Sequence, residues 1–131
     1  MRTTEVRGDT AESARSLWML TLAPSIWAAH LLLSYTTAAI WCEKIAGPSG
    51  ALGLVRTAIG CYTVVALLGI SLVAWRGLRW HRHGTETTTH DLDTPEDRHR
   101  FLGFATLLLA GLSALATLYA AFAAAFFRGC N

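Results

Sequence analysis

Long runs of apolar residues alternate with short polar segments along this chain. The apolar runs cover residues 17–42, 51–75 and 101–127 of 131, and their only formally charged residue is Arg56. A helix of about 20 apolar residues can cross a hydrocarbon layer about 30 Å thick. Helices of soluble bundles, in contrast, carry charges along one face. The pattern predicts an all-α membrane bundle of three transmembrane helices.

Positive charge is distributed unevenly among the polar segments. Arginines gather in the head, residues 1–16, and in the loop at 76–100, whereas the loop at 43–50 has only Lys44 and the tail at 128–131 only Arg128. Segments rich in Lys and Arg stay in the cytoplasm. We therefore expect a single membrane domain with its N-terminus in the cytoplasm and its C-terminus outside.

Capping residues mark where the helices begin. Asp9 and Glu12 form a capping pattern that predicts a short N-terminal amphipathic segment lying at the inner surface before Pro24. A single helix kinked at Pro24 is the alternative, and the sequence leaves both open. Thr94 followed by Pro95 predicts an N-cap and a first helical residue for the third helix.

Two cysteines are expected to meet at the outer surface. Cys42 ends the first apolar run and Cys130 follows the third. An oxidising outer face allows a disulfide between them if the first and third helices are neighbours. Cys61 lies inside the second run, where a role as a small apolar residue is expected.

Polar side chains inside the spans are candidates for function because they are costly in lipid. His30 lies near the middle of the first span, with Ser34 one turn later. Tyr62 and Thr63 of the second span and residues 115–117 of the third reach about the same depth. We expect a neutral histidine hydrogen-bonded between helices; a partner contact, a proton-linked role, and a haem or metal ligand are the alternatives. The intramembrane polar or partner-contact candidates are Trp27, His30, Ser34, Tyr35, Arg56 and Tyr62.

Arg56 is expected either to extend towards the outer interface or to pair with Glu43.

Small residues recur on the third span at four-residue spacing, which lets a partner helix approach closely. A general richness in alanine is the alternative explanation. The predicted packing face is Ala116, Ala120 and Ala124, with Ser113, Thr117 and Ala121 beside it.

Enzymatic chemistry is not indicated by any motif. His81, His83 and His90 in the second loop are weak metal candidates, because their spacing is loose and the loop has no cysteine. Catalytic and phosphate-binding patterns are absent from the sequence, and a net charge of +2 with mixed signs in the loop gives no nucleic-acid signature. We expect no cofactor; haem or copper is the remaining possibility.

A family resemblance is carried by the first and third spans. The pattern Pro24-x-x-Trp27-Ala28-x-His30-x-x-x-Ser34-Tyr35 ending in Cys42, and a Leu/Ala-rich helix from Arg100-Phe101-Leu102 to Cys130, resemble small three-helix membrane proteins. Those proteins are encoded beside bacterial caa3-type heme-copper cytochrome c oxidases and their assembly factors. Phe126-Phe127-Arg128-Gly129 stands where those proteins carry prolines.

The resemblance implies an accessory or assembly-linked subunit of a respiratory oxidase in the bacterial inner membrane. Such a subunit acts by helix packing, with the lipid bilayer and oxidase subunits as partners. The alternative is a free-standing membrane carrier or binder of a metal, haem or small solute. A carrier needs a polar path through the layer, for which one histidine and scattered hydroxyls are sparse.

Overall fold

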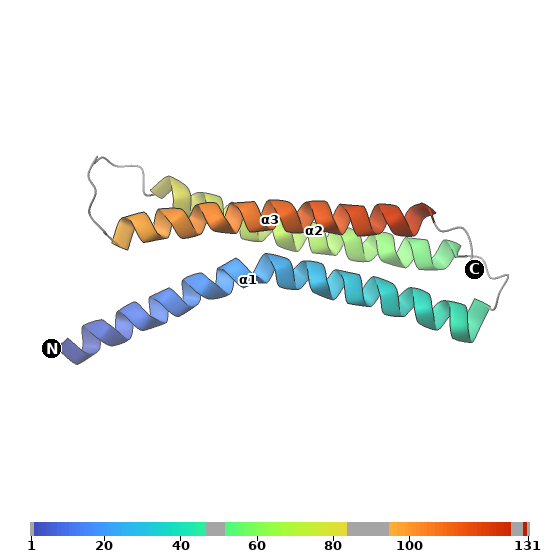
Figure 1. Cartoon of the computed structure of the whole chain (residues 1–131), viewed down its shortest axis with the longest axis horizontal. Coiled ribbons are helices and arrows are strands. Elements are labelled where there is room, and N and C mark those ends of the chain that lie inside the picture. The colour runs from blue at the N-terminus through green and yellow to red at the C-terminus, as the bar shows by residue number, and fades with distance from the viewer. Residues whose placement is uncertain (1, 47–51, 84–94, 127–129, 131) are drawn as a thin grey trace.

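Three long helices lie side by side in the computed structural model of the chain (Figure 1). It describes residues 2–46, 52–83, 95–126 and 130, with side chains for 17–45, 52–79, 82, 100–126 and 130, and these residues contain no strand. The elements are α1 (Arg2–Ile40), a π-helical segment η1 (Trp41–Ala46), α2 (Gly53–His83) and α3 (Pro95–Phe126).

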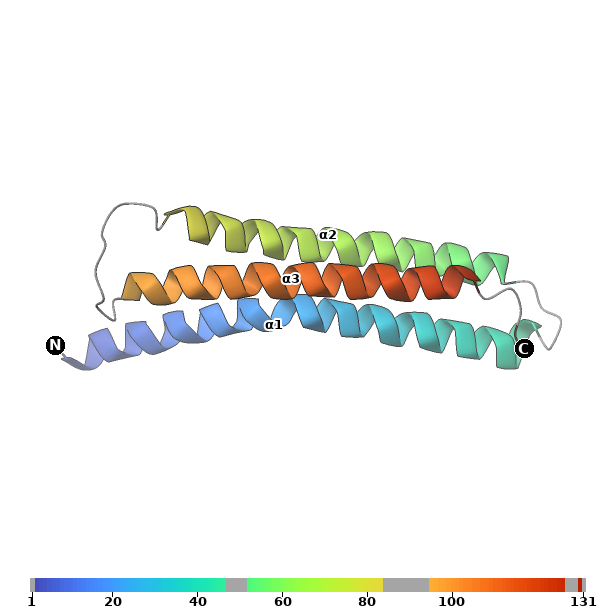
Figure 2. The same ribbon diagram turned by 45° about the horizontal axis from the view of Figure 1, so that its top comes forward.

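The helices alternate in direction, so α1 and α3 are parallel and α2 is antiparallel to both. Figures 1 and 2 place the chain's two termini at opposite ends of the bundle. Three stretches are long and apolar enough to cross a membrane: Leu17–Ile45, Gly53–Arg79 and Arg100–Phe126. The predicted fold class, an all-α bundle of three transmembrane helices, is confirmed.

Helical structure extends into both ends of the second polar segment. Within residues 76–100, the predicted cytoplasmic loop, α2 continues to His83 and α3 begins at Pro95. Polar residues do not stop a helix once it has left the lipid, because water can solvate their side chains. The predicted start at Pro95 is correct, whereas Thr94 lies outside the described residues.

The first helix is continuous through Pro24. Of the two alternatives, a separate amphipathic helix or one long helix, the structure has the long helix, which contains Pro24 and runs from Arg2 to Ile40. Figure 1 shows it bending near its middle, so that its N-terminal part diverges from the other helices. Proline removes one backbone hydrogen bond and is a common cause of such bends.

Buried positions recur every three or four residues on α2 and α3. This is the spacing of left-handed packing between helices that cross at a small angle. On α2 these positions are Val55, Ile59, Thr63, Ala66, Ile70, Val73 and Gly77, and on α3 they are Gly103, Thr106, Ala110, Ser113 and Thr117.

Small and polar residues share the interior with valines and isoleucines of α2, while many leucines and phenylalanines face outwards. Side chains such as Leu32, Leu72, Leu112 and Phe126 are more than half exposed. The buried positions of α3 carry only Gly, Ala, Ser and Thr. Exposing so many large apolar side chains is unfavourable in water but not among lipid tails. Small residues in the interior let the helices approach closely. The distribution of residues is therefore that of a membrane bundle.

Two glycines of α2 give each neighbouring helix room to approach. A Cβ atom at Gly77 would lie 3.3 Å from Thr106 Cγ2 and 3.5 Å from the Gly103 carbonyl oxygen of α3. One at Gly69 would lie 3.2 Å from Ile26 Cδ1 of α1. Larger side chains at these positions would push the helices apart.

We predict that Gly77→Leu destabilises the bundle by about 1–3 kcal/mol, as expected for overpacking. Gly60→Leu on the same helix is the matched control, because Gly60 is exposed and a Cβ there has no atom within 4 Å. Unfolding of both variants in mixed detergent micelles, followed by circular dichroism, measures the difference. Equal stability of the two variants would contradict the close packing of α2 on α3.

Candidate functional site

A buried histidine near the middle of the bundle joins α1 to α2. His30 Nε2 of α1 lies 3.0 Å from Thr63 Oγ1 of α2. His30 is 3% exposed and Thr63 is 8% exposed. The sequence placed these residues at similar depth, and the structure brings them into a hydrogen bond between helices. An interhelical hydrogen bond of this kind stabilises a membrane bundle by about 1 kcal/mol.

The buried threonines turn their hydroxyl groups onto their own helices. Thr63 donates to the Ile59 carbonyl at 2.7 Å, Thr106 to the Leu102 carbonyl at 2.7 Å, and Thr117 to the Ser113 carbonyl at 2.8 Å. A hydroxyl has only one proton to donate. The hydroxyl protons of these threonines are therefore used within their own helices, and Thr63 also bonds across to His30.

Three buried polar atoms have no hydrogen-bond partner within the part of the chain that the structure describes. They are His30 Nδ1, Ser34 Oγ and Trp41 Nε1, all in the first span between its middle and the end that carries Cys42. Ser34 follows His30 by one helical turn, so the two lie on the same face of α1. The pair is the most chemically distinctive feature of the interior.

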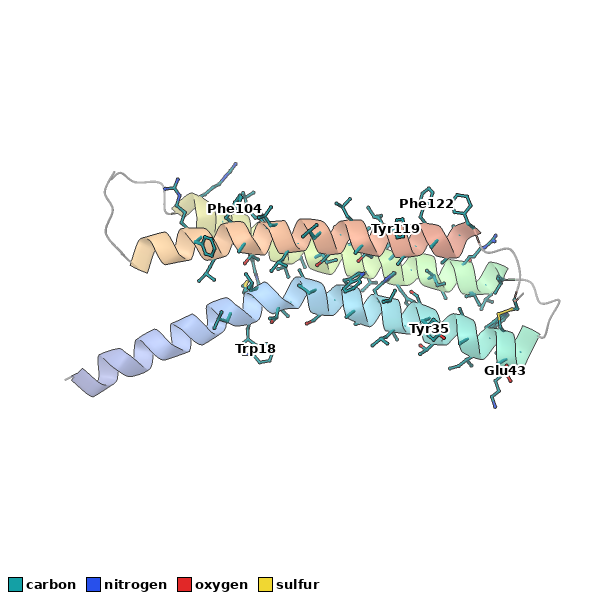
Figure 3. The ribbon with its side chains drawn as sticks, viewed as in Figure 1. Trp18, Tyr35, Glu43, Phe104, Tyr119 and Phe122 are labelled. Atoms are coloured by element: carbon teal, nitrogen blue, oxygen red, sulfur yellow. A yellow bond between two sulfur atoms is a disulfide. The ribbon has the colours of Figure 1, made fainter. Side chains whose placement is uncertain are left out.

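The other candidates on α1 and α2 lie in different surroundings. Trp27 and Tyr62 are half-buried, and Arg56 is exposed in the first turns of α2. Tyr35 is 73% exposed and points away from the other helices (Figure 3). His30 is enclosed by its own bundle, so a partner protein does not reach it, whereas Tyr35 is open to a partner.

On α3 the buried row runs beside the predicted packing face. Ala116, Ala120 and Ala124 are half-buried, whereas Ser113 and Thr117 are buried, with Thr117 fully enclosed at 0% exposure. Sequence reasoning missed the continuation of this row towards the start of the helix. The row was detectable, because its small residues alternate spacings of three and four: Gly103, Thr106, Ala110, Ser113 and Thr117.

The two predicted disulfide partners meet at the end of the bundle opposite the N-terminus. Their sulfur atoms lie 2.01 Å apart and their Cα atoms 5.6 Å apart, as a disulfide requires (Figure 3). Cys42 comes from η1 and Cys130 from the tail, at a sequence separation of 88. Closing so long a loop stabilises a fold by about 4.6 kcal/mol in the chain-entropy account. Cys61 is free and exposed.

The opposite end of α2 carries an aromatic and cationic pair. The guanidinium carbon of Arg79 lies 4.5 Å from the centre of the Trp75 ring. Trp and Arg are typical of the interface between lipid and water, where the ring contacts lipid and the cation reaches headgroups. This pair fits the end of the span at Arg79.

Metal-binding geometry is not formed by the described residues. Among them, no group of three or more His, Cys, Asp or Glu is placed to hold an ion. The weak candidates cannot be placed, because the side chains of His81 and His83, and all of His90, lie outside the described part.

Comparison of the chain with protein families, curated proteins and solved structures gives no match.

We predict that Thr63→Val, which removes the partner of His30 Nε2, lowers the free energy of unfolding by about 1 kcal/mol. Thr57→Val is the matched control on the same helix, because Thr57 is exposed and bonds only to the Gly53 carbonyl. That control is expected to stay within about 0.5 kcal/mol of the parent. Unfolding in mixed micelles compares them, and an equal loss in both variants would exclude a stabilising His30–Thr63 bond.

Proposed function

We propose that this protein is a non-catalytic membrane subunit that assists or stabilises a larger membrane complex through helix packing. The proposal rests on one observation: the interior of the bundle is closely packed. Small residues bring the helices close together, and the buried threonine hydroxyls are bonded to their own backbones. Such an interior holds a bundle together and leaves the outer surface for contact with other membrane components.

A tyrosine exposed deep in the span supports a protein partner. Tyr35 lies about 10 Å along the helix from Cys42, where the apolar run of its span ends and the charged residues Glu43 and Lys44 follow. Its phenol would need to bond within the hydrocarbon layer, where lipid tails offer no acceptor. Tyr119 of α3 is 80% exposed and lies at a similar depth, about 10 Å from Phe126. We assign the contact to Tyr35 because this residue belongs to the first-span pattern on which the sequence resemblance rests.

A respiratory heme-copper oxidase is the partner we propose. This part of the proposal rests on the sequence resemblance of the first and third spans to proteins encoded beside caa3-type oxidases. The exposed apolar helix faces are compatible with docking against an oxidase core within the bilayer. The surface we assign to the contact is the Tyr35 face of α1, because the His30 face packs within the bundle.

A membrane carrier is the second candidate, and one observation favours it. Among the described residues, His30 Nδ1 and Ser34 Oγ are buried polar atoms without hydrogen-bond partners, and a solute could engage them. A transport path for a solute needs such polar groups in succession across the lipid bilayer. The hydroxyls of Thr63 and Thr117 already donate hydrogen bonds to backbone carbonyls. They could therefore contribute to a transport path only as hydrogen-bond acceptors. The accessory role is accordingly better supported.

We further propose that the protein lies in a bacterial inner membrane with the disulfide at the outer surface. The uneven distribution of arginine supports this orientation, since the Arg-rich segments belong to the end opposite the disulfide. An oxidising outer compartment also favours the bond.

Treatment of intact spheroplasts with a membrane-impermeant reductant is predicted to cleave the Cys42–Cys130 bond. Electrophoresis after thiol blocking measures the change in mobility, in a Cys61→Ser background that leaves a single pair of thiols. The Cys42→Ser variant, which cannot form the bond, marks the mobility of the open chain. Cleavage only after the membrane is permeabilised would place this end in the cytoplasm and overturn the orientation.

Affinity capture from native membranes in mild detergent tests the partner. We predict that the tagged protein recovers terminal oxidase subunits, and that Tyr35→Phe lowers recovery about three- to tenfold, the effect of one hydrogen bond in lipid. Tyr119→Phe is the matched control and should leave recovery unchanged. Quantitative mass spectrometry reads the result.

Recovery of the intact protein without oxidase subunits would refute the oxidase assignment. Recovery with a stoichiometric metal, haem or small solute in their place would favour the carrier.

A further inference from the structure

The hydrogen bond between His30 and Thr63 identifies which ring nitrogen carries the proton. Thr63 Oγ1 lies 2.7 Å from the Ile59 carbonyl oxygen, which can only accept, so the hydroxyl proton is used there. Thr63 Oγ1 must then accept the bond from His30 Nε2 at 3.0 Å. In a neutral imidazole with a proton on Nε2, the other nitrogen, Nδ1, has an unshared electron pair and no proton.

That electron pair is buried and has no donor among the residues that the structure describes. Ser34 Oγ, one helical turn further along α1, is buried and likewise has no partner in that part of the chain. A buried polar group left unpaired costs about 1–3 kcal/mol, and folded proteins commonly satisfy such groups with a bound water. Here an acceptor and a hydroxyl, which can both donate and accept, lie on the same face of one helix.

We propose that His30 Nδ1 and Ser34 Oγ bind one small protic molecule of the size and chemistry of water. The molecule donates a hydrogen bond to Nδ1 and forms a second hydrogen bond with the Ser34 hydroxyl. Its class follows from the site: Nδ1 needs a donor, and the 3% exposure of His30 excludes a large ligand. A metal ion fits poorly, because the described residues supply no set of three ligands.

The bound molecule completes a polar layer that fixes the orientation of the histidine ring. Nε2 is directed to α2 by Thr63, and Nδ1 is held through the bridge to Ser34 of its own helix. This site belongs to the bundle itself and requires no partner protein. It is therefore testable on the purified full-length chain in lipid.

Solid-state nitrogen-15 NMR of the chain with labelled histidine rings, in phosphatidylcholine vesicles, tests the site. A His30→Asn variant identifies the His30 signals by subtraction. We expect a protonated Nε2, an unprotonated Nδ1, and transfer of magnetisation from water protons to Nδ1. Ser34→Ala should weaken this transfer several-fold, whereas Thr36→Val, which removes an exposed hydroxyl bonded to the Leu32 carbonyl, should leave it unchanged.

A proton on Nδ1, no transfer from water to that nitrogen, or transfer unaffected by Ser34→Ala would each overturn the proposal. Ser34→Thr keeps the hydroxyl and is expected to retain the signal, which provides a second variant if Ser34→Ala does not fold. Binding of added zinc or copper at Nδ1, with displacement of the water signal, would replace the protic ligand with a metal and also refute the proposal.

Discussion

Helices in a hydrocarbon layer gain little by burying large apolar side chains, because lipid tails are as apolar as leucine. Association must come from close van der Waals contact and from hydrogen bonds between helices. This constraint explains the interior of the bundle, where Gly77 meets Thr106 and Gly103, and Gly69 meets Ile26. It also explains why the leucines and phenylalanines are outside. The rest of the structure depends on this close approach.

Polar groups enter such an interior only when their hydrogen bonds are satisfied. Thr106 and Thr117 meet this requirement within their own helix, which allows them to pack as small residues without requiring a partner. The ring of His30 forms no such bond to its own helix among the residues that the structure describes. One ring nitrogen reaches Thr63 across the interface and the other is left for the Ser34 face. The histidine therefore contributes both to helix packing, through Nε2, and to the proposed binding site, through Nδ1.

The disulfide and the helix packing stabilise the bundle at different places. Close packing acts along α2 and α3, whereas the Cys42–Cys130 bond ties the end of the first span to the tail beyond α3. Together they give a compact unit with a closed interior. In the proposed accessory role, such a unit presents a fixed surface around Tyr35 to a partner. The three helices do not have to separate for the partner to bind.

The sequence by itself determined the three spans, the helix start at Pro95 and the placement of Cys42 and Cys130 at the same end of the bundle, because each follows from length, hydropathy, capping and the parity of membrane crossings. It also placed His30 and Thr63 at similar depth. That the two cysteines are close enough to bond depends on the neighbouring positions of the first and third helices in the folded bundle. Only the tertiary structure decided that α1 continues through Pro24, that Ser113 and Thr117 are more deeply buried than Ala116 and its neighbours, and that His30 faces inwards while Tyr35 faces outwards. Depth can be counted along one helix, but the side it presents to its neighbours depends on how all three helices pack together.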